Sequence, residues 1–462
     1  MRQNQLDKHE QTMADRTQVQ ERYRLSLLIF SHIIVCCVSL VDVSRYGYTF
    51  GFAPPTFHIF YDVASFNNAV AVVATFALIS PVFALARFSF GYFVGFYFYT
   101  MILGYLWLNC FTDLNYDHRL AGLSAAVSAC AFLWPALLVT SPLGQKHTLS
   151  ARAFDQALRF IVLFAVATIV VGAFYNFRIV APNDIYYFRD QITAPTVVNY
   201  LVAIVSTALL PFAFAGFVLR KAHWWAAAVV LLLLFFYPIT LSKVALLTPA
   251  WLVAILLLSK IFEARISVIL SIFAPMVGGL VSLFLFRTYA AFAFSTVNFR
   301  LIAIPSVAMD VYNDFFSRHD LTYFCQISVL KPIMRCPYED QLSVVMERAF
   351  HLGNFNASLF ATEGIASIGP FFAPVAALAC GLAIAVANRL SAGLPPPFIL
   401  MSGAILPQVM LNVSLTTVLI THGGAILFLL WYLTPRSFFE QTDPHAARRV
   451  TRWKWPFQYQ PS

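Results

Sequence analysis

The chain has 462 residues, of which 60% are hydrophobic and only 11% are charged, and its formal net charge is +9. Water-soluble domains carry roughly 25% charged residues, so a chain this apolar has too little polar surface to fold in water. The composition excludes a soluble globular protein and predicts an integral membrane protein whose solvent is lipid.

The N-terminal segment, residues 1–24, is polar and of mixed charge, and an apolar run long enough to span a bilayer follows it directly. This order predicts a retained membrane anchor rather than a cleaved signal peptide. Further apolar runs recur along the chain, and a helix of about 20 residues crosses the hydrocarbon. The sequence therefore predicts an all-α fold of about twelve transmembrane helices, with cores at 25–41, 69–86, 88–111, 120–140, 160–177, 197–219, 224–237, 245–258, 266–286, 365–387, 398–411 and 415–433.

The distribution of the 30 basic residues predicts the orientation. If the helices alternate from a cytoplasmic N-terminus, the short outside loops hold only Arg45, Arg119, Arg178, Arg189 and Lys243, which agrees with the positive-inside rule. The net charge thus reflects topology, and we expect no nucleic-acid partner. Five parts follow: a cytoplasmic N-terminal segment (1–24), nine transmembrane helices (25–286), a long periplasmic loop (287–364), three more transmembrane helices (365–433) and a basic cytoplasmic tail (434–462).

The long outside loop is too rich in Tyr, Phe and Ile for a disordered linker. We expect it to fold down onto the membrane with short interfacial helices, one of them capped by Asp340. Cys325 and Cys336 lie in this loop, where an oxidising compartment would allow a disulfide. Their spacing alone leaves that bond open, because it does not give the geometry. The other five cysteines lie in or beside apolar runs and are interpreted as small core residues.

Several outside cations are candidates for binding an anionic ligand. Lys243 lies between two short apolar segments, so it either lines a cavity or reaches back to the interface from an outer turn. Arg178, Arg287, Arg300 and Arg348 run against the topological bias, and the planar guanidinium can bind two phosphate oxygens. The alternative for each arginine is pairing with an acid of the loop itself.

The candidate proton acceptors are Glu363, Asp314 and His319. Glu363 comes one turn before a membrane helix, where it could accept a proton from an attacking hydroxyl or complement the helix dipole. Asp314 and His319 are the other candidate bases. Asn354 and Asn356 could bind sugar hydroxyls or cap the next helix.

Other motifs are missing from the sequence. We find no nucleotide-binding loop, no hydrolase elbow and no metal-binding spacing of Cys and His, and we expect neither a metal nor another cofactor. His422, inside the last apolar run, is interpreted as a buried hydrogen-bonded histidine.

Three stretches of the chain resemble the bacterial Wzy-type polymerases of O-antigen and exopolysaccharide repeat units. They are 237–243 with Pro249, then 300–305 continuing into 312–316 and His319, and finally 354–364 continuing into Ile368 and Gly369. The general plan is also similar, with about twelve spans, cytoplasmic termini and a large outside loop late in the chain. The resemblance implies a GT-C-like polymerase architecture in the bacterial inner membrane.

The resemblance also implies a reaction. A glycan would move from undecaprenyl diphosphate onto a lipid-linked repeat unit at the periplasmic face, with basic side chains on the departing diphosphate and no metal. The substrates would be undecaprenyl-diphosphate-linked oligosaccharides, and a chain-length regulator and a flippase would be partner proteins. Two alternatives remain: another lipid-linked glycosyltransferase or ligase, and a polyprenyl-glycan flippase or transporter. The residues expected to contact substrate are Arg178, Lys243, Arg287, Arg300, Tyr312, Arg348, Asn354 and Asn356.

Overall fold

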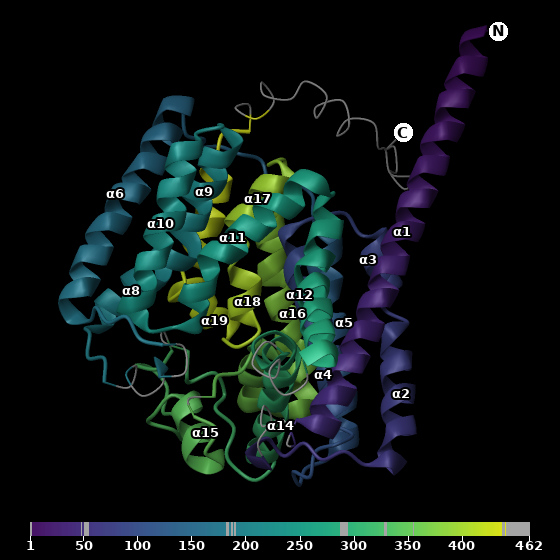
Figure 1. The fold of residues 1–462 in the computed structure, drawn as a ribbon, viewed down its shortest axis with the longest axis vertical. Coiled ribbons are helices and arrows are strands. Elements are labelled where there is room, and N and C mark those ends of the chain that lie inside the picture. The colour runs from purple at the N-terminus through teal and green to yellow at the C-terminus, as the bar shows by residue number, and fades with distance from the viewer. Residues whose placement is uncertain are drawn as a thin grey trace.

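The computed structural model describes residues 2–47, 49, 55–181, 184, 185, 188, 191–286, 294–327, 330–353, 355–436 and 439, with the backbone alone for 2–18. Regular structure in these ranges is helical, which confirms the all-α prediction (Figure 1). Within them, ten helical segments are long and apolar enough to cross a membrane, as a multi-pass membrane protein requires.

These ten segments coincide with the first ten predicted cores. They are α1 (Arg2–Tyr46), α2 with α3 (Val63–Ala77, Pro81–Leu85), α4 (Phe90–Leu108), α5 (His118–Leu138), α6 (Ala151–Tyr175), the run α8, η2 and α9 (Thr196–Ile204, Val205–Leu209, Leu210–Leu219), α10 (His223–Thr240), α11 (Lys243–Ile261), α12 (Ala264–Phe286), and η5 with α16 (Phe360–Ile365, Ala366–Ser391).

Polar residues in the breaks between apolar runs start several of these helices. The side chains of Ser89, Asp117 and Ser150 each accept a backbone N–H in the first turn of α4, α5 and α6, respectively. Such caps satisfy amide groups that a helix leaves unpaired at its start. The breaks therefore fix where each crossing begins.

The last two predicted cores are interrupted helices. The first consists of α17 (Pro396–Ser402) and α18 (Leu406–Met410), and the second of α19 (Leu415–Ile420) and α20 (Gly424–Leu433). Pro407 opens α18, and Gly423 adopts a left-handed φ of 74° before α20, so neither run continues as one helix. The count of about twelve crossings stays a prediction.

Residues 295–316 of the long loop pack inside the helix bundle and not on the membrane surface as expected. The π-helical η4 (Ser295–Ala303) continues into α14 (Ile304–Phe316), and every residue of α14 after Ile304 is buried. The helix contacts α4, and η4 contacts α1 and α12. Gly279 and Gly104 allow this close approach, since a Cβ atom at either position would meet Asn298 or Ser306 at under 3 Å. The surface expectation is therefore wrong for this segment.

Helix α4 forms the centre of the bundle, and all of its residues are buried. It contacts α1, α2, α5, α14 and α16. Its aromatic side chains pack edge to face, as Phe98 does with Phe132 and Phe360 at 5.1 Å between ring centroids. This core fixes α14 and η5, the two elements that carry the site described below.

Further along the loop is α15 (Leu342–Phe350), which lies at the lower end of the molecule in Figure 1. We call this end the loop end, and the opposite one, where α1 begins, the N-terminal end. Asp340 does not cap α15: the N-cap position is Gln341, and the Asp340 carboxylate instead pairs with Arg348 at 2.6 Å. Cys325 and Cys336 form a disulfide with their Cα atoms 5.4 Å apart, which settles the question that their spacing left open.

The disulfide predicts the outcome of a thiol count. Under denaturing conditions the five free cysteines should react with a polyethylene-glycol maleimide before reduction, and two further cysteines only after it. The number of adducts, read as gel shifts, should therefore rise by two on reduction. An unchanged number would show that both loop cysteines are free thiols.

Candidate functional site

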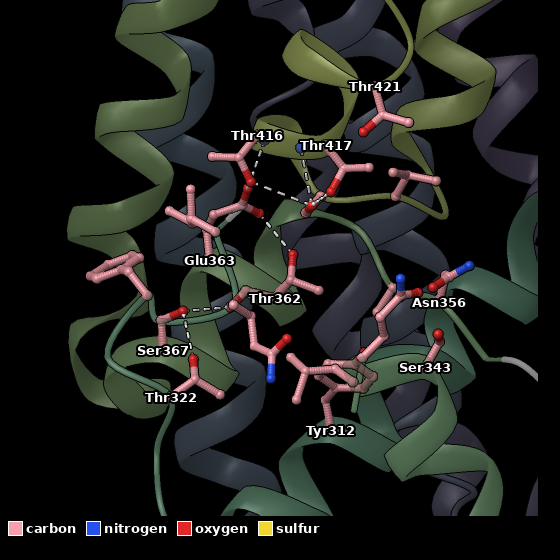
Figure 2. A pocket seen from close by; sticks show the side chains of 18 of the residues that line it. Tyr312, Thr322, Ser343, Asn356, Thr362, Glu363, Ser367, Thr416, Thr417 and Thr421 are labelled. Carbon is pink, nitrogen blue, oxygen red and sulfur yellow. Dashed lines mark hydrogen bonds between the residues drawn. The ribbon is translucent and has the colours of Figure 1, made fainter. Parts of the chain in front are cut away.

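A polar cavity of about 310 Å³ lies at the loop end, between α14, the segment 322–327, the start of α15, η5 and the connection that contains α19. We call it the carboxylate chamber. Figure 2 shows that its side chains converge from segments far apart in the sequence. The lining includes Tyr312, Thr322, Asn356, Glu363, Thr416 and His422.

Glu363 is the acid of this chamber, and three hydrogen bonds hold it. Its Oε1 accepts from the backbone N and the Oγ1 of Thr416, both at 2.9 Å, and its Oε2 accepts from the Oγ1 of Thr362 at 2.7 Å (Figure 2). Ser414 caps α19 and so places the Thr416 amide at the first turn. Only 5% of Glu363 is exposed. A buried carboxylate fixed in this way can accept a proton from a bound hydroxyl.

Neutral polar groups make up most of the remaining lining. Ser367 donates from Oγ to the Thr362 carbonyl at 2.8 Å and lies 3.2 Å from the hydroxyl of Thr322. Tyr312 lines the chamber from α14, where burial and then the charge of Glu363 raise the pKa of its phenol. Such a set of hydroxyl and amide groups suits a ligand with many hydroxyls, such as a sugar.

A second cavity, of about 510 Å³, adjoins the first. Asn356, Val413 and His422 line both, so the two spaces share a wall. We call the second space the arginine chamber, because Arg300 lines it. It lies between α6, α8 with η2, α10, α11 and the segment 408–413.

Arg300 brings positive charge to this second chamber. It is half-buried and belongs to η4, which the buried helix α14 continues. Among the described residues it has neither an ion-pair nor a hydrogen-bond partner. The guanidinium is therefore available to an anionic ligand, and phosphate matches its planar fork.

Lys243 begins α11 at the edge of the arginine chamber. Its neighbours Ser242 and Val244 line that chamber, whereas Lys243 itself does not. The structure thus places the lysine beside the site. Of the residues expected to contact substrate, Arg300, Tyr312 and Asn356 line the chambers.

Two of the three candidate bases lie elsewhere. Asp314 pairs with Arg318 and accepts a hydrogen bond from the Asn115 amide at 3.1 Å. His319 stacks on Phe315 with 3.9 Å between ring centroids. Neither side chain lines a chamber, because both are engaged in these other contacts. Glu363 alone of the three lines a chamber.

The other predicted arginines contact partners of their own. Arg348 forms the ion pair with Asp340. This confirms, for Arg348, the alternative that the arginine pairs with an acid of the loop itself. Arg178 donates to Gln191 at 3.1 Å and lies 5.9 Å from the ring centroid of Phe188. Arg287 and Asn354 lie outside the described residues.

Comparisons with protein-family models, with curated proteins and with solved structures find no match for this chain. The resemblance to Wzy-type polymerases therefore rests on the three stretches quoted above. All three supply chamber residues: Ile239, Thr240 and Ser242 come from the first, Arg300 and Tyr312 from the second, and Asn356 and Glu363 from the third. In the part of the chain that the structure describes, no group of three or more His, Cys, Asp or Glu side chains could hold a metal ion.

The position of His422 between the two chambers was not predicted from the sequence. The histidine lines both chambers, and its Nδ1 is buried with no partner in the described structure. Thr207 donates to its backbone carbonyl at 2.7 Å, which fixes the backbone rather than the ring. The signal in the sequence was the pair Gly423 and Gly424 directly after the histidine, since glycines inside an apolar run predict a break.

A buried carboxylate, Asp310, anchors α14 on the face opposite the chamber. Its Oδ1 accepts a hydrogen bond from the phenol of Tyr116, and Asn313 donates to the phenol of Tyr105 at 3.0 Å. Only 1% of Asp310 is exposed. Burial raises the pKa of Asp310 from 3.8 to about 8, although the hydrogen bond from Tyr116 acts the other way.

This anchor predicts a pH dependence of stability. The folded-state pKa of Asp310 is raised, so the protonated carboxyl stabilises the fold. This stabilisation is fully present below about pH 4 and is lost as the pH rises through about 8. The Asp310→Asn variant has no titratable carboxyl at this position. Its free energy of unfolding minus that of wild type should therefore increase between pH 4 and pH 8 and then level off. Thermal unfolding in detergent across this range measures the difference, and parallel curves for the two proteins would contradict it.

Proposed function

We propose that this protein is a polysaccharide polymerase of the bacterial inner membrane. It transfers a glycan from undecaprenyl diphosphate onto a lipid-linked repeat unit at the periplasmic face. The observation that carries this proposal is the pair of adjoining chambers, one with the carboxylate of Glu363 and the other with the guanidinium of Arg300. Transfer from a diphosphate donor needs a proton acceptor on one side of the reacting carbon and a cation on the other.

In this proposal the carboxylate chamber binds the acceptor sugar, and the arginine chamber binds the diphosphate of the donor. A hydroxyl of the acceptor sugar, bound by Asn356 and the threonines, attacks the anomeric carbon of the donor and gives its proton to Glu363. The bond from that carbon to the diphosphate oxygen breaks, and the diphosphate leaves with the electron pair. Arg300 stabilises the negative charge that develops on it. The apolar walls of the arginine chamber, with Phe236 and Ile239 among them, suit the lipid part.

The topology that fits this proposal has about twelve crossings in a GT-C-like arrangement, with the two interrupted helix pairs as the last two. The disulfide supports a loop end that faces the periplasm, because structural disulfides persist in oxidising compartments. Both termini are then cytoplasmic, in agreement with the positive-inside rule. A flippase that delivers the repeat units and a chain-length regulator are the partner proteins that this function requires.

Deletion of the gene in its own host tests the proposal. Gel analysis of the surface glycan should show single repeat units where wild-type cells make long polymer, and a plasmid copy should restore the polymer. Unchanged polymer length in the deletion strain would overturn the proposal. A glycan lacking one sugar, or one left on its lipid at full length, would instead indicate another lipid-linked glycosyltransferase or a ligase.

A second candidate function is transport of a polyprenyl-linked glycan. Interrupted helices favour it, since α18, α19 and the π-helical segments η2, η4 and η5 all supply residues that line the two chambers. Discontinuous helices of this kind form substrate sites in many transporters. Proteoliposomes that move a fluorescent lipid-linked oligosaccharide between leaflets, without lengthening it, would favour transport.

A further inference from the structure

A third cavity lies at the N-terminal end and shares no lining residue with either chamber. Its volume is about 850 Å³, and it is bordered by α9, α10, α11 and α17, which lie together in the upper part of Figure 1. Most of its wall is apolar, with Phe214, Val230, Leu231, Val253 and Leu256 among the lining residues. An elongated apolar ligand is what such a wall between membrane helices can hold.

Three basic groups line the same cavity. Lys221 lies in the turn between α9 and α10, His223 begins α10, and Lys260 lies in the last turn of α11. No acid is among the residues that line it. Within the described structure neither lysine has an ion-pair partner. The cavity therefore combines an apolar wall with positive charge at the ends of its helices.

Two tryptophans fix the depth of this basic group in the membrane. Trp224 and Trp225 follow His223 directly, and they are 90% and 40% exposed. Exposed tryptophans at helix ends gather at the level of the lipid headgroups. Lys221, His223 and Lys260 thus lie at headgroup depth, and the apolar wall extends from there toward the acyl chains.

We propose that this cavity binds a phospholipid with an anionic headgroup from the leaflet at the N-terminal end. The phosphate and the charged headgroup contact Lys221, His223 and Lys260, and an acyl chain lies against the apolar residues of α10 and α11. Basic pockets between transmembrane helices are suited to anionic lipids for this reason. The site does not depend on the proposed function, because it lies at the other end of the bundle from both chambers.

Lipid bound here would also stabilise the walls of the arginine chamber. The helices α10 and α11 run from this cavity to that chamber, where Phe236 and Thr240 of α10 and Thr248 of α11 line it. A ligand that binds only the folded protein raises its apparent stability by mass action. Anionic lipid should therefore raise the unfolding temperature of the whole protein.

The test compares dioleoylphosphatidylglycerol with dioleoylphosphatidylcholine, each titrated into the full-length protein in a non-ionic detergent. The anionic lipid should raise the thermal unfolding midpoint at concentrations where the zwitterionic lipid does not. In the Lys221→Gln and Lys260→Gln variants the apparent affinity for phosphatidylglycerol should fall about fivefold each, which corresponds to about 1 kcal/mol for one basic residue near an anionic headgroup.

The matched control is Arg152→Gln, since Arg152 is an exposed basic residue at the start of α6 that does not line the cavity. Its response to lipid should equal that of wild type. Equal effects of the two lipids, or the same loss in the control variant, would overturn the proposal. So would an equal effect of inorganic phosphate, because it would show an anion site without an acyl chain.

A second variant tests the apolar half of the site. Ala227 lines the cavity and is exposed to it, so Ala227→Phe should occupy acyl-chain space while the basic residues stay in place. Its midpoint without lipid should match wild type, and its shift with phosphatidylglycerol should be reduced. A full lipid response in this variant would place the acyl chain outside the cavity and contradict the proposal.

Discussion

Replacement of Glu363 by Gln should reduce polymer formation by about two to four orders of magnitude, the range that loss of a general base produces. Gln has nearly the same shape and keeps an oxygen that can accept the hydrogen bonds from Thr416, so the fold around the chamber should persist. The side chain would no longer accept a proton from the acceptor hydroxyl. Glu363→Asp should restore part of the rate, because it keeps the carboxylate.

The measurement is the rate of chain growth with purified protein and a lipid-linked repeat unit. Asp320→Asn is the matched control, since Asp320 is an exposed acid of the same loop that lines neither chamber. Its rate should equal that of wild type. If Glu363→Gln polymerised at the wild-type rate, Glu363 would not be the proton acceptor.

Arg300→Ala should lower the rate by about two to three orders of magnitude, as loss of one preorganised group that stabilises developing negative charge typically does. Arg300→Lys should retain an intermediate rate, because lysine keeps the charge but cannot offer the planar fork. The same growth assay measures both variants. Its readout separates chemistry from lipid binding if the donor is supplied at saturating concentration.

Arg348→Ala is the control for this second prediction. Arg348 is an arginine of the same loop, but it is exposed and paired with Asp340 rather than facing a chamber. The rate of Arg348→Ala should change little, since exposed ion pairs contribute about 0–1 kcal/mol to stability. Equal losses at Arg348 and Arg300 would mean that the position in the arginine chamber has no special role.

The membrane helices could be predicted because long apolar runs determine them. The first ten predicted cores correspond to ten helical segments. The interruptions in the last two runs were missed, although Pro407 and the pair Gly423 and Gly424 mark them in the sequence. Apolarity alone gives the length of a run, whereas these residues decide whether one helix can fill it.

The buried position of α14 could not be predicted from its own residues. Asp310, Asn313 and Asp314 make the segment look like a surface helix. Their partners Tyr116, Tyr105 and Asn115 lie about 200 positions earlier in the chain, and only the fold brings them together. Polar groups can be buried when such hydrogen bonds satisfy them.

The site was predicted in part for a similar reason. Glu363 and Arg300 were identified as outside charges near membrane helices, and both line chambers. Asp314 has the same charge as Glu363, and Arg348 the same charge as Arg300, but both pair with neighbouring side chains. A sequence does not show which charged residue has a partner. The hydroxyl of Thr416 was missed because threonine in an apolar run resembles part of a helix interior.

The most direct test is reconstitution of the purified protein with a chemically defined undecaprenyl-diphosphate-linked repeat unit, followed by gel analysis of the products. We expect a ladder of glycans that differ by one repeat unit, release of undecaprenyl diphosphate with each step, and loss of the ladder in Glu363→Gln. Repeat units that stay at their original length in the presence of folded wild-type protein would contradict the proposed polymerase function.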